Sequence, residues 1–219
     1  DVTEAASGLA SSPAETASRV RHGGFLRSAE LFERRFFSIS SAEAAAIDPQ
    51  QRQLLEHGYS ALHAAGMSRA ALPSAQVAVN VGQWQSEYAS HLTASAGHGV
   101  YALTGFSCSV TCGRVSFALD LHGPCASYDT ACSASLVANH GSVRALQRVE
   151  CGSALSAGAN MILDAVAMRA NAVAGFLSVR GRSHTFDARA DGYARSEAID
   201  VVTSCRGAGS GDASSGTRM

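Results

Sequence analysis

The clearest pattern of hydrophobic and polar positions lies between residues 47 and 66. Apolar side chains recur there at helical spacing, and the set is Ile47, Leu54, Leu55, Tyr59 and Leu62. Asp48 is a good N-cap residue, Pro49 suits the first helical position, and Gln51 is expected to bond back to the cap and complete a capping box. Gly66 supplies a stop. The pattern therefore predicts a helix that begins after Asp48 and ends before Gly66.

Two segments have the alternation that is typical of β-strands. Val77, Val79 and Val81 alternate with small or polar residues within the segment 76–84. The segment 151–163 alternates small and apolar side chains in the same way. We therefore predict one strand in each segment.

Two further segments have helical periodicity. The segment 104–120 has apolar residues spaced for a buried helix, namely Val110, Val115, Ala118 and Leu119. In the segment after residue 132, one helix face is expected to hold Leu136, Val137, His140, Val143 and Leu146. Both segments are predicted helices.

Composition and charge exclude several classes of protein. The chain has 219 residues, of which 46% are hydrophobic, which is enough for a substantial core in one large or two small domains. Low aromatic content and 21 glycines suit an α/β protein with tight strand-to-helix turns. With 17 basic and 18 acidic side chains, the chain has no net field that would attract nucleic acid or an acidic membrane. No apolar run approaches the roughly 18 residues of a membrane span.

The domain organisation is expected to have three parts. Residues 1–21 are rich in small and polar residues and are predicted to form an irregular lead-in. Residues 22–202 form the main region, and residues 203–219 are predicted to be a flexible tail. Because the chain opens on Asp1 rather than Met, its natural start is expected to lie upstream, and a targeting segment cannot be judged.

The six cysteines have no metal-binding pattern. No Cys-x-x-Cys pair and no His-x-x-x-His pair occur, so no zinc site is expected. Their spacing is irregular, and a chain of this size does not need disulfides. We therefore expect reduced thiols in an intracellular compartment.

Cys132 differs from the other cysteines in its context. Residues 124–138 form a strand-like run that ends in a turn and opens directly into a periodic helix, with Cys132 at the junction. Unpaired N–H groups in the first turn of a helix favour the reactive thiolate, and the neighbouring alanines and serines leave the sulfur accessible. The local pattern also fits a buried structural cysteine, because free cysteines are often buried.

His140 is a poor candidate for the base of a Cys132 nucleophile. Eight helical positions separate the two residues, which is about 12 Å along the axis. This distance exceeds hydrogen-bonding reach. We therefore expect His140 to pack or hydrogen-bond within the fold.

Several ordered motifs give the chain a family resemblance. Residues 129–138 read Asp-Thr-Ala-Cys-Ser-Ala-Ser-Leu-Val-Ala, which resembles the active-site signature of the β-ketoacyl synthases, the condensing enzymes of fatty acid and polyketide synthesis. Ala134 replaces the middle serine of that signature. Further resemblances are Gly-Gly-Phe-Leu at 23–26, Asp-Pro-Gln-Gln-Arg at 48–52, Gly-Arg-Val-Ser at 113–116 and Phe-Asp-Ala-Arg-Ala-Asp-Gly-Tyr-Ala-Arg at 186–195. The chain is thus similar to the N-terminal part of the family.

Some positions depart from the family pattern. Ser38 stands where the family commonly has glycine, and Ser196 and Ala198 replace the two glycines that flank Glu197. Glycine at such places often supplies a positive φ or a close backbone approach. The resemblance therefore leaves the backbone geometry around Glu197 open.

The resemblance implies a thiolase-like fold, which is α/β and has two similar halves. This chain resembles most of the first half, a mixed sheet flanked by helices, and has no counterpart of the family's opening strand or second half. An incomplete sheet would favour a homodimer, association with a complementing ketosynthase half, or aggregation.

The resemblance also implies a reaction. Cys132 would accept an acyl group from a carrier-protein thioester for a decarboxylative Claisen condensation, in a cytoplasmic or plastid setting. No cofactor is implied, because the phosphopantetheine of an acyl carrier protein carries the substrates. The family's two later histidine motifs have no match, and His98, in a Gly-His-Gly run, precedes the nucleophile. The isolated chain is therefore not expected to complete the condensation.

Two other functions compete with this one. A truncated ketosynthase-like chain could act without catalysis, as a dimerisation or carrier-protein-binding scaffold. A papain-like cysteine hydrolase is disfavoured because the Cys-Gly-Ser-Cys-Trp pattern is absent. Acylation of Cys132 would separate the first alternative from a synthase.

Overall fold

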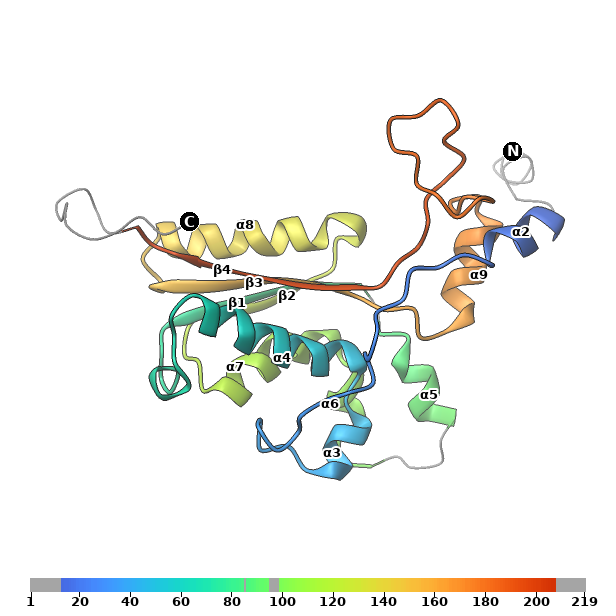
Figure 1. The fold of residues 1–219 in the computed structure, drawn as a ribbon. Helices are drawn as coiled ribbons and strands as arrows, with labels where there is room; N and C mark the ends of the chain where they lie inside the picture. The colour runs from blue at the N-terminus through green and yellow to red at the C-terminus, as the bar shows by residue number, and fades with distance from the viewer. Residues whose placement is uncertain (1–12, 85, 95–98, 208–219) are drawn as a thin grey trace, which may run out of the picture.

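The computed structural model describes residues 13–84, 86–94 and 99–207. This part of the chain contains both helices and strands (Figure 1). In chain order they are α2 (Pro13–Arg19), α3 (Ser41–Ala46), α4 (Pro49–Ala64), η1 (Arg69–Ala71), β1 (Val77–Gln83), α5 (Tyr88–Ala94), α6 (Ala102–Phe106), α7 (Cys108–Leu119), β2 (Cys125–Tyr128), η2 (Ala131–Ser133), α8 (Ala134–Gln147), β3 (Ser153–Asn160), α9 (Ala165–Val173) and β4 (Ala198–Cys205).

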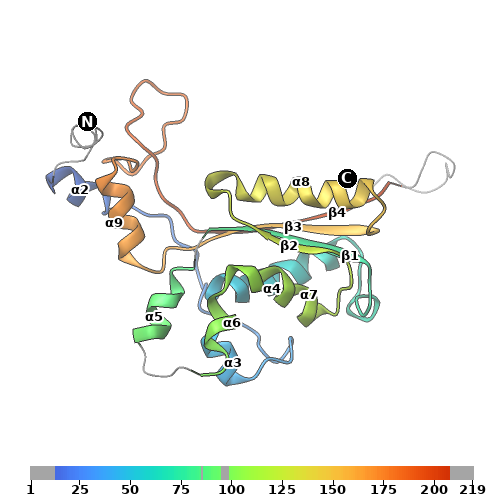
Figure 2. The ribbon, with the colours of Figure 1, turned by 180° about the vertical axis from the view of Figure 1, so that it is seen from behind.

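A mixed sheet of four strands in the order β2-β1-β3-β4 forms the centre. β1 pairs in parallel with β2 and β3, whereas β4 is antiparallel to β3. Helix α8 covers one face of the sheet, and α4 and α7 cover the other (Figures 1 and 2). The prediction of an α/β fold with a mixed sheet flanked by helices is confirmed.

Strand β1 lies at the heart of the core. Both predicted strands form, at Val77–Gln83 and Ser153–Asn160. All seven residues of β1 are buried, although its sequence alternates, because helices pack on both faces of the sheet. Its three valines pack in one cluster with Leu54 and Leu55 of α4.

Helix α4 forms as predicted, but its first turn is stabilised differently. Asp48 accepts a hydrogen bond from the Gln50 N–H at 2.7 Å, and Gly66, at φ +89°, follows the helix end. The predicted capping box is wrong. The Gln51 side chain points away from the cap, donating to the carbonyl of Ser107 at 3.3 Å and accepting from Arg114 Nε at 2.7 Å. These partners lie more than fifty positions away, so local sequence could not indicate them.

The predicted face of α8 is wrong except at Leu146, which is buried. The buried residues are small ones with one leucine, namely Ala134, Ala138, Ser142, Ala145 and Leu146. Leu136 is 70% exposed, and His140 is exposed rather than packed. The small residues let the first turns of the helix lie very close to the sheet, so Leu136 points away from it.

The two ends of the described chain differ from the expected boundaries. Helix α2 occupies Pro13–Arg19, inside the predicted irregular lead-in. The Arg19 guanidinium donates to the carbonyls of Gly175, Leu177 and Asp191, which attaches α2 beside α9 (Figure 1). Strand β4 continues to Cys205, so the predicted start of the tail at 203 falls within a strand. Residues 1–12 and 208–219 lie outside the described residues.

None of the helices in the described ranges is long and apolar enough to cross a membrane.

The buried cap of α4 predicts a pH effect on stability. Burial raises the pKa of the Asp48 carboxyl above its ordinary value of 3.8, although hydrogen bonds from Ser86 and Gln50 oppose the shift. Between pH 3.8 and the raised pKa of the folded state, the folded chain binds more protons than the unfolded chain. The free energy of unfolding therefore falls as pH rises through this range. The stability advantage of wild type over Asp48→Asn should therefore be larger below pH 3.8 than at neutral pH, as denaturant unfolding would measure.

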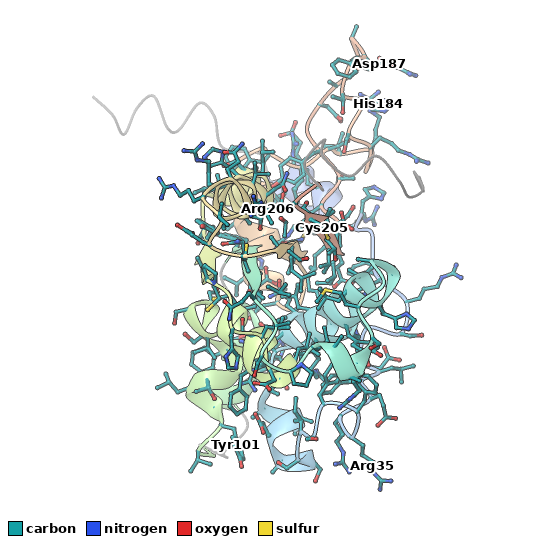
Figure 3. All side chains as sticks on the ribbon, turned by 90° about the vertical axis from the view of Figure 1, so that its left-hand side faces the viewer. Arg35, Tyr101, His184, Asp187, Cys205 and Arg206 are labelled. Atoms are coloured by element: carbon teal, nitrogen blue, oxygen red, sulfur yellow. The ribbon has the colours of Figure 1, made fainter. Side chains whose placement is uncertain are left out.

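Asp187 provides a control of opposite sign. It lies on a loop that projects from the layers (Figure 3), and hydrogen bonds from Arg189 lower its pKa to about 2. The stability advantage of wild type over Asp187→Asn, measured as unfolding free energy, should therefore grow as pH rises from about 2 to 3.8 and stay constant above that range. If the difference in unfolding free energy between wild type and Asp48→Asn did not vary with pH, burial would not raise the pKa of Asp48.

Candidate functional site

The turn that holds Cys132 is built from the residues between β2 and α8. Ala131 has φ +53°, and its N–H donates to Asp129 Oδ1 at 3.1 Å. Ser133 Oγ donates to the Thr130 carbonyl at 2.8 Å, which closes the other side of the turn. Cys132 therefore lies in a sharp elbow, in the short helix η2 that leads directly into α8.

The Cys132 thiol is exposed. This excludes the alternative of a buried structural cysteine. The expected position at a strand-to-helix junction is confirmed, with a single 3₁₀ turn before the first residue of α8. The catalytic role of the thiol stays a prediction.

Two glycines of the sheet let α8 approach closely enough to place this elbow. A Cβ atom added at Gly82 of β1 would lie 2.3 Å from the Ala134 carbonyl carbon and 2.4 Å from the Ser135 nitrogen. A Cβ atom added at Gly158 of β3 would lie 2.8 Å from Ser135 Cβ. The first turn of α8 thus rests on bare backbone, and Gly82 and Gly158 control the position of Cys132.

A cavity of about 1000 Å³ opens beside Cys132. It runs between the start of α8, the ends of β1 and β3, α9 and the segment before β4. Its lining includes polar and aromatic side chains from separate parts of the chain, among them Trp84, Asn139, Asn160, Asn171, Phe176, Tyr193 and Arg195. The cavity is large enough to hold an organic group attached to the thiol.

A buried ion pair supports one wall of the cavity. Arg195 bonds Glu87, and their side chains are only 6% and 5% exposed. The Arg195 guanidinium carbon lies 5.5 Å from the centre of the Trp84 ring. Glu87 Oε2 accepts the N–H groups of Leu163 and Asp164, each at 2.8 Å. One carboxylate therefore joins the loop after β1, the loop after β3 and the segment before β4.

Tyr193 supplies a hydroxyl to the cavity. Its oxygen donates to Asn171 Oδ1 at 3.0 Å. Burial raises the pKa of Tyr193, Arg195 opposes that shift, and Cys132 adds to it. The phenol therefore stays protonated at neutral pH, and Asn171 holds its hydroxyl hydrogen.

The motif around Glu197 keeps a regular backbone without its glycines. Neither Ser196 nor Ala198 is among the positive-φ residues of the described chain. Glu197 Oε1 accepts from the Ile162 N–H at 3.0 Å, and Oε2 accepts from the Leu26 N–H at 2.8 Å. The glycine that permits a close contact here is Gly24, which faces Ser196. A Cβ atom on Gly24 would lie 2.8 Å from Ser196 Oγ.

Sequence reasoning identified Cys132 but not its surroundings. Arg195 belongs to a motif that the sequence shows, yet its partner Glu87 lies 108 positions away. No histidine is among the described residues that line the cavity, and His98 lies outside the described residues. No group of three metal-ligating side chains occurs within the described ranges either. The geometry thus offers an exposed thiol and a cavity.

Comparisons with known proteins agree with these features. Residues 2–203 match the family model described as "Beta-ketoacyl synthase, N-terminal domain". The chain is 40% identical over 183 residues to a mycocerosic acid synthase-like polyketide synthase of Mycolicibacterium smegmatis, which covers 83% of this chain and 9% of that protein. It is 41% identical over 181 residues to the 5-methylorsellinic acid synthase of Aspergillus terreus, which covers 83% of this chain and 7% of that protein. The chain thus spans less than a tenth of these relatives.

Solved ketosynthases share the fold. The ketosynthase from module 6 of the bacillaene synthase of Bacillus subtilis has a TM-score of 0.74 at 31% identity, over 84% of this chain and 31% of that chain. The oxazolomycin ketosynthase domain of Streptomyces albus has a TM-score of 0.75 at 34% identity, over 83% and 31%. These likenesses confirm the expected thiolase-like fold. The chain belongs to the β-ketoacyl synthase family, and the part that matches is the family's N-terminal domain.

Proposed function

We propose that Cys132 is the acyl-accepting nucleophile of a ketosynthase reaction in polyketide or fatty acid synthesis. The observation that carries the proposal is an exposed thiol on a strand-to-helix elbow at the mouth of a large cavity. The family relationship supports the same role. The chemistry needs no cofactor, because the substrate arrives as a thioester on the phosphopantetheine of an acyl carrier protein.

The loading step is a thioester exchange. The Cys132 thiolate attacks the carbonyl carbon of the carrier thioester, and the carbon–sulfur bond to phosphopantetheine breaks. The departing thiolate takes up the proton that Cys132 released. The Cys132 backbone N–H is the expected first donor to the oxyanion that forms in between.

We assign only this loading step to the chain by itself. No histidine is among the cavity-lining residues in the described part, and the sequence lacks the family's two later histidine motifs. Decarboxylation and carbon–carbon bond formation would then depend on a complementing ketosynthase half. The exposed Leu136 and Val143 on the outer face of α8 suit packing against such a half or a second copy.

Acylation of the purified chain tests the proposal. Incubation with an acyl group carried on acyl carrier protein should add one acyl group to wild type and none to Cys132→Ala, as intact mass spectrometry would measure. Cys205→Ala is the matched control, because Cys205 is also exposed but lies at the far end of β4, and it should be acylated like wild type.

A scaffold function gives the opposite result. If folded wild-type protein binds the carrier protein or dimerises but gains no acyl group, the chain acts without catalysis. Release of CO₂ from a malonyl carrier by the chain alone would contradict the restriction to loading.

A further inference from the structure

Two aromatic residues of the cavity lining, Phe176 and Tyr193, lie on segments that are paired through their backbones. The Tyr193 N–H donates to the Phe176 carbonyl at 2.9 Å, and the Ser178 N–H donates to the Tyr193 carbonyl at 3.0 Å. Phe176 is 57% exposed and Tyr193 is 41% exposed, so apolar surface of both rings is open to an occupant of the cavity. We call the two segments, 175–178 and 191–193, the paired segments.

Close packing holds the paired segments together. Leu177 is 1% exposed and packs with Met168 and Ala172 of α9. Gly192 has φ +132°, and a Cβ atom there would lie 2.6 Å from the Phe176 carbonyl oxygen and 2.6 Å from the Leu177 carbonyl carbon. Only glycine therefore lets the two backbones approach this closely.

Arg19, at the end of α2, ties the paired segments to each other. Its Nη1 atom donates to the carbonyls of Gly175 and Asp191, each at 3.3 Å, and to the carbonyl of Leu177. Gly175 and Leu177 flank Phe176, whereas Asp191 belongs to the other segment. Hydrogen bonds from a charged donor are about twice as strong as neutral ones. One guanidinium thus joins both segments that carry the aromatic rings of the cavity.

We propose that Arg19 is a positioning residue that favours long acyl groups on Cys132, an inference that rests on the proposed acylation. Arg19 holds the paired segments in place, so a long acyl chain meets the rings of Phe176 and Tyr193 already ordered and loses little entropy in the contact. An acetyl group ends one carbon beyond its carbonyl and gains little from such apolar surface. Arg19 therefore changes the choice of acyl group without touching the reacting atoms.

Alkylation of Cys132 tests the proposal without any acyl transfer. The purified protein is treated with iodoacetamide or with N-octyl iodoacetamide, and the rate at Cys132 is followed by fragmentation mass spectrometry of the tryptic peptide 115–144. In Arg19→Gln the ratio of the octyl rate to the iodoacetamide rate should fall by about threefold to tenfold, because the rings must then be ordered by the incoming chain. Arg19→Lys keeps the charge but not the planar fork and should recover part of the ratio.

Matched variants separate this effect from general loosening of the fold, which would change both rates together and leave their ratio unaltered. Gly192→Ala forces the paired segments apart directly and should lower the ratio as Arg19→Gln does. Arg21→Gln removes an exposed arginine two positions along the chain and should leave the ratio unchanged. An unchanged ratio in Arg19→Gln, or an equal fall in Arg21→Gln, would overturn the proposal.

The acyl-carrier assay distinguishes failure of this inference from failure of the proposed function. With octanoyl and acetyl groups on acyl carrier protein, the ratio of their transfer rates should fall in Arg19→Gln as the alkylation ratio does. A wild-type chain that is never acylated would refute the proposed function, and the alkylation ratio would still decide whether Arg19 orders the rings. Normal acylation with the same octanoyl preference in wild type and Arg19→Gln would refute the role of Arg19 alone.

Discussion

Gly82→Ala is expected to lower the free energy of unfolding by about 3 kcal/mol and to slow acylation of Cys132 markedly. The added methyl would lie 2.3 Å from the carbonyl carbon of Ala134, and that neighbour is backbone rather than the end of a flexible side chain. Relief requires α8 to move away from β1. Because the helix begins directly after η2, its displacement moves Cys132 as well. Denaturant unfolding and the acylation assay measure the two effects.

Gly113→Ala is the control for this substitution. Gly113 lies within α7, and no atom would meet the added methyl within 4 Å. Alanine is the better helix former, so the unfolding free energy of this variant should rise by up to about 1 kcal/mol. Its Cys132 should be acylated like that of wild type. If Gly82→Ala unfolded and reacted like Gly113→Ala, the close approach of α8 to the sheet would not exist in solution.

The same contact explains which parts of the fold the sequence could predict. Helix α4 and strands β1 and β3 follow from local periodicity and local stop signals, and each was predicted close to its observed bounds. The buried face of α8 could not be found in this way. Large apolar residues usually mark the buried side of a helix, but here Gly82 and Gly158 admit only small ones, so Leu136 points outward. A rule based on residue size alone therefore selects the wrong face.

The candidate site likewise has one part that the sequence could predict and one part that it could not. Cys132 lies in one continuous motif, so its position at the elbow was predictable from adjacent residues. The cavity wall was not, because Glu87 and Arg195 meet only after the sheet has formed. Gln51 likewise bonds Arg114 rather than its own helix start. Long-range polar partners depend on tertiary packing, which local patterns do not encode.

Glu87→Gln is expected to cost about 3–5 kcal/mol of unfolding free energy. Glutamine keeps an oxygen for the N–H groups of Leu163 and Asp164, but it leaves the Arg195 guanidinium buried without a counter-charge. Arg195 Nη1 already lacks a hydrogen-bond partner in the described structure, so the pairing with Glu87 is its main compensation. Denaturant unfolding measures the loss. Emission of Trp84, the single tryptophan of the chain, reports movement of the guanidinium beside its ring.

A double-mutant cycle separates the ion pair from simple loss of packing. Arg195→Gln alone leaves Glu87 buried and unpaired, whereas Glu87→Gln with Arg195→Gln leaves no buried charge. The double variant should therefore be more stable than the sum of the single effects predicts, by about 1–3 kcal/mol. Glu150→Gln removes one partner of the exposed Arg148–Glu150 pair and should cost less than about 1 kcal/mol. Additive single effects at Glu87 and Arg195 would mean that the two charges do not depend on each other, and the cavity wall would then be held by packing alone.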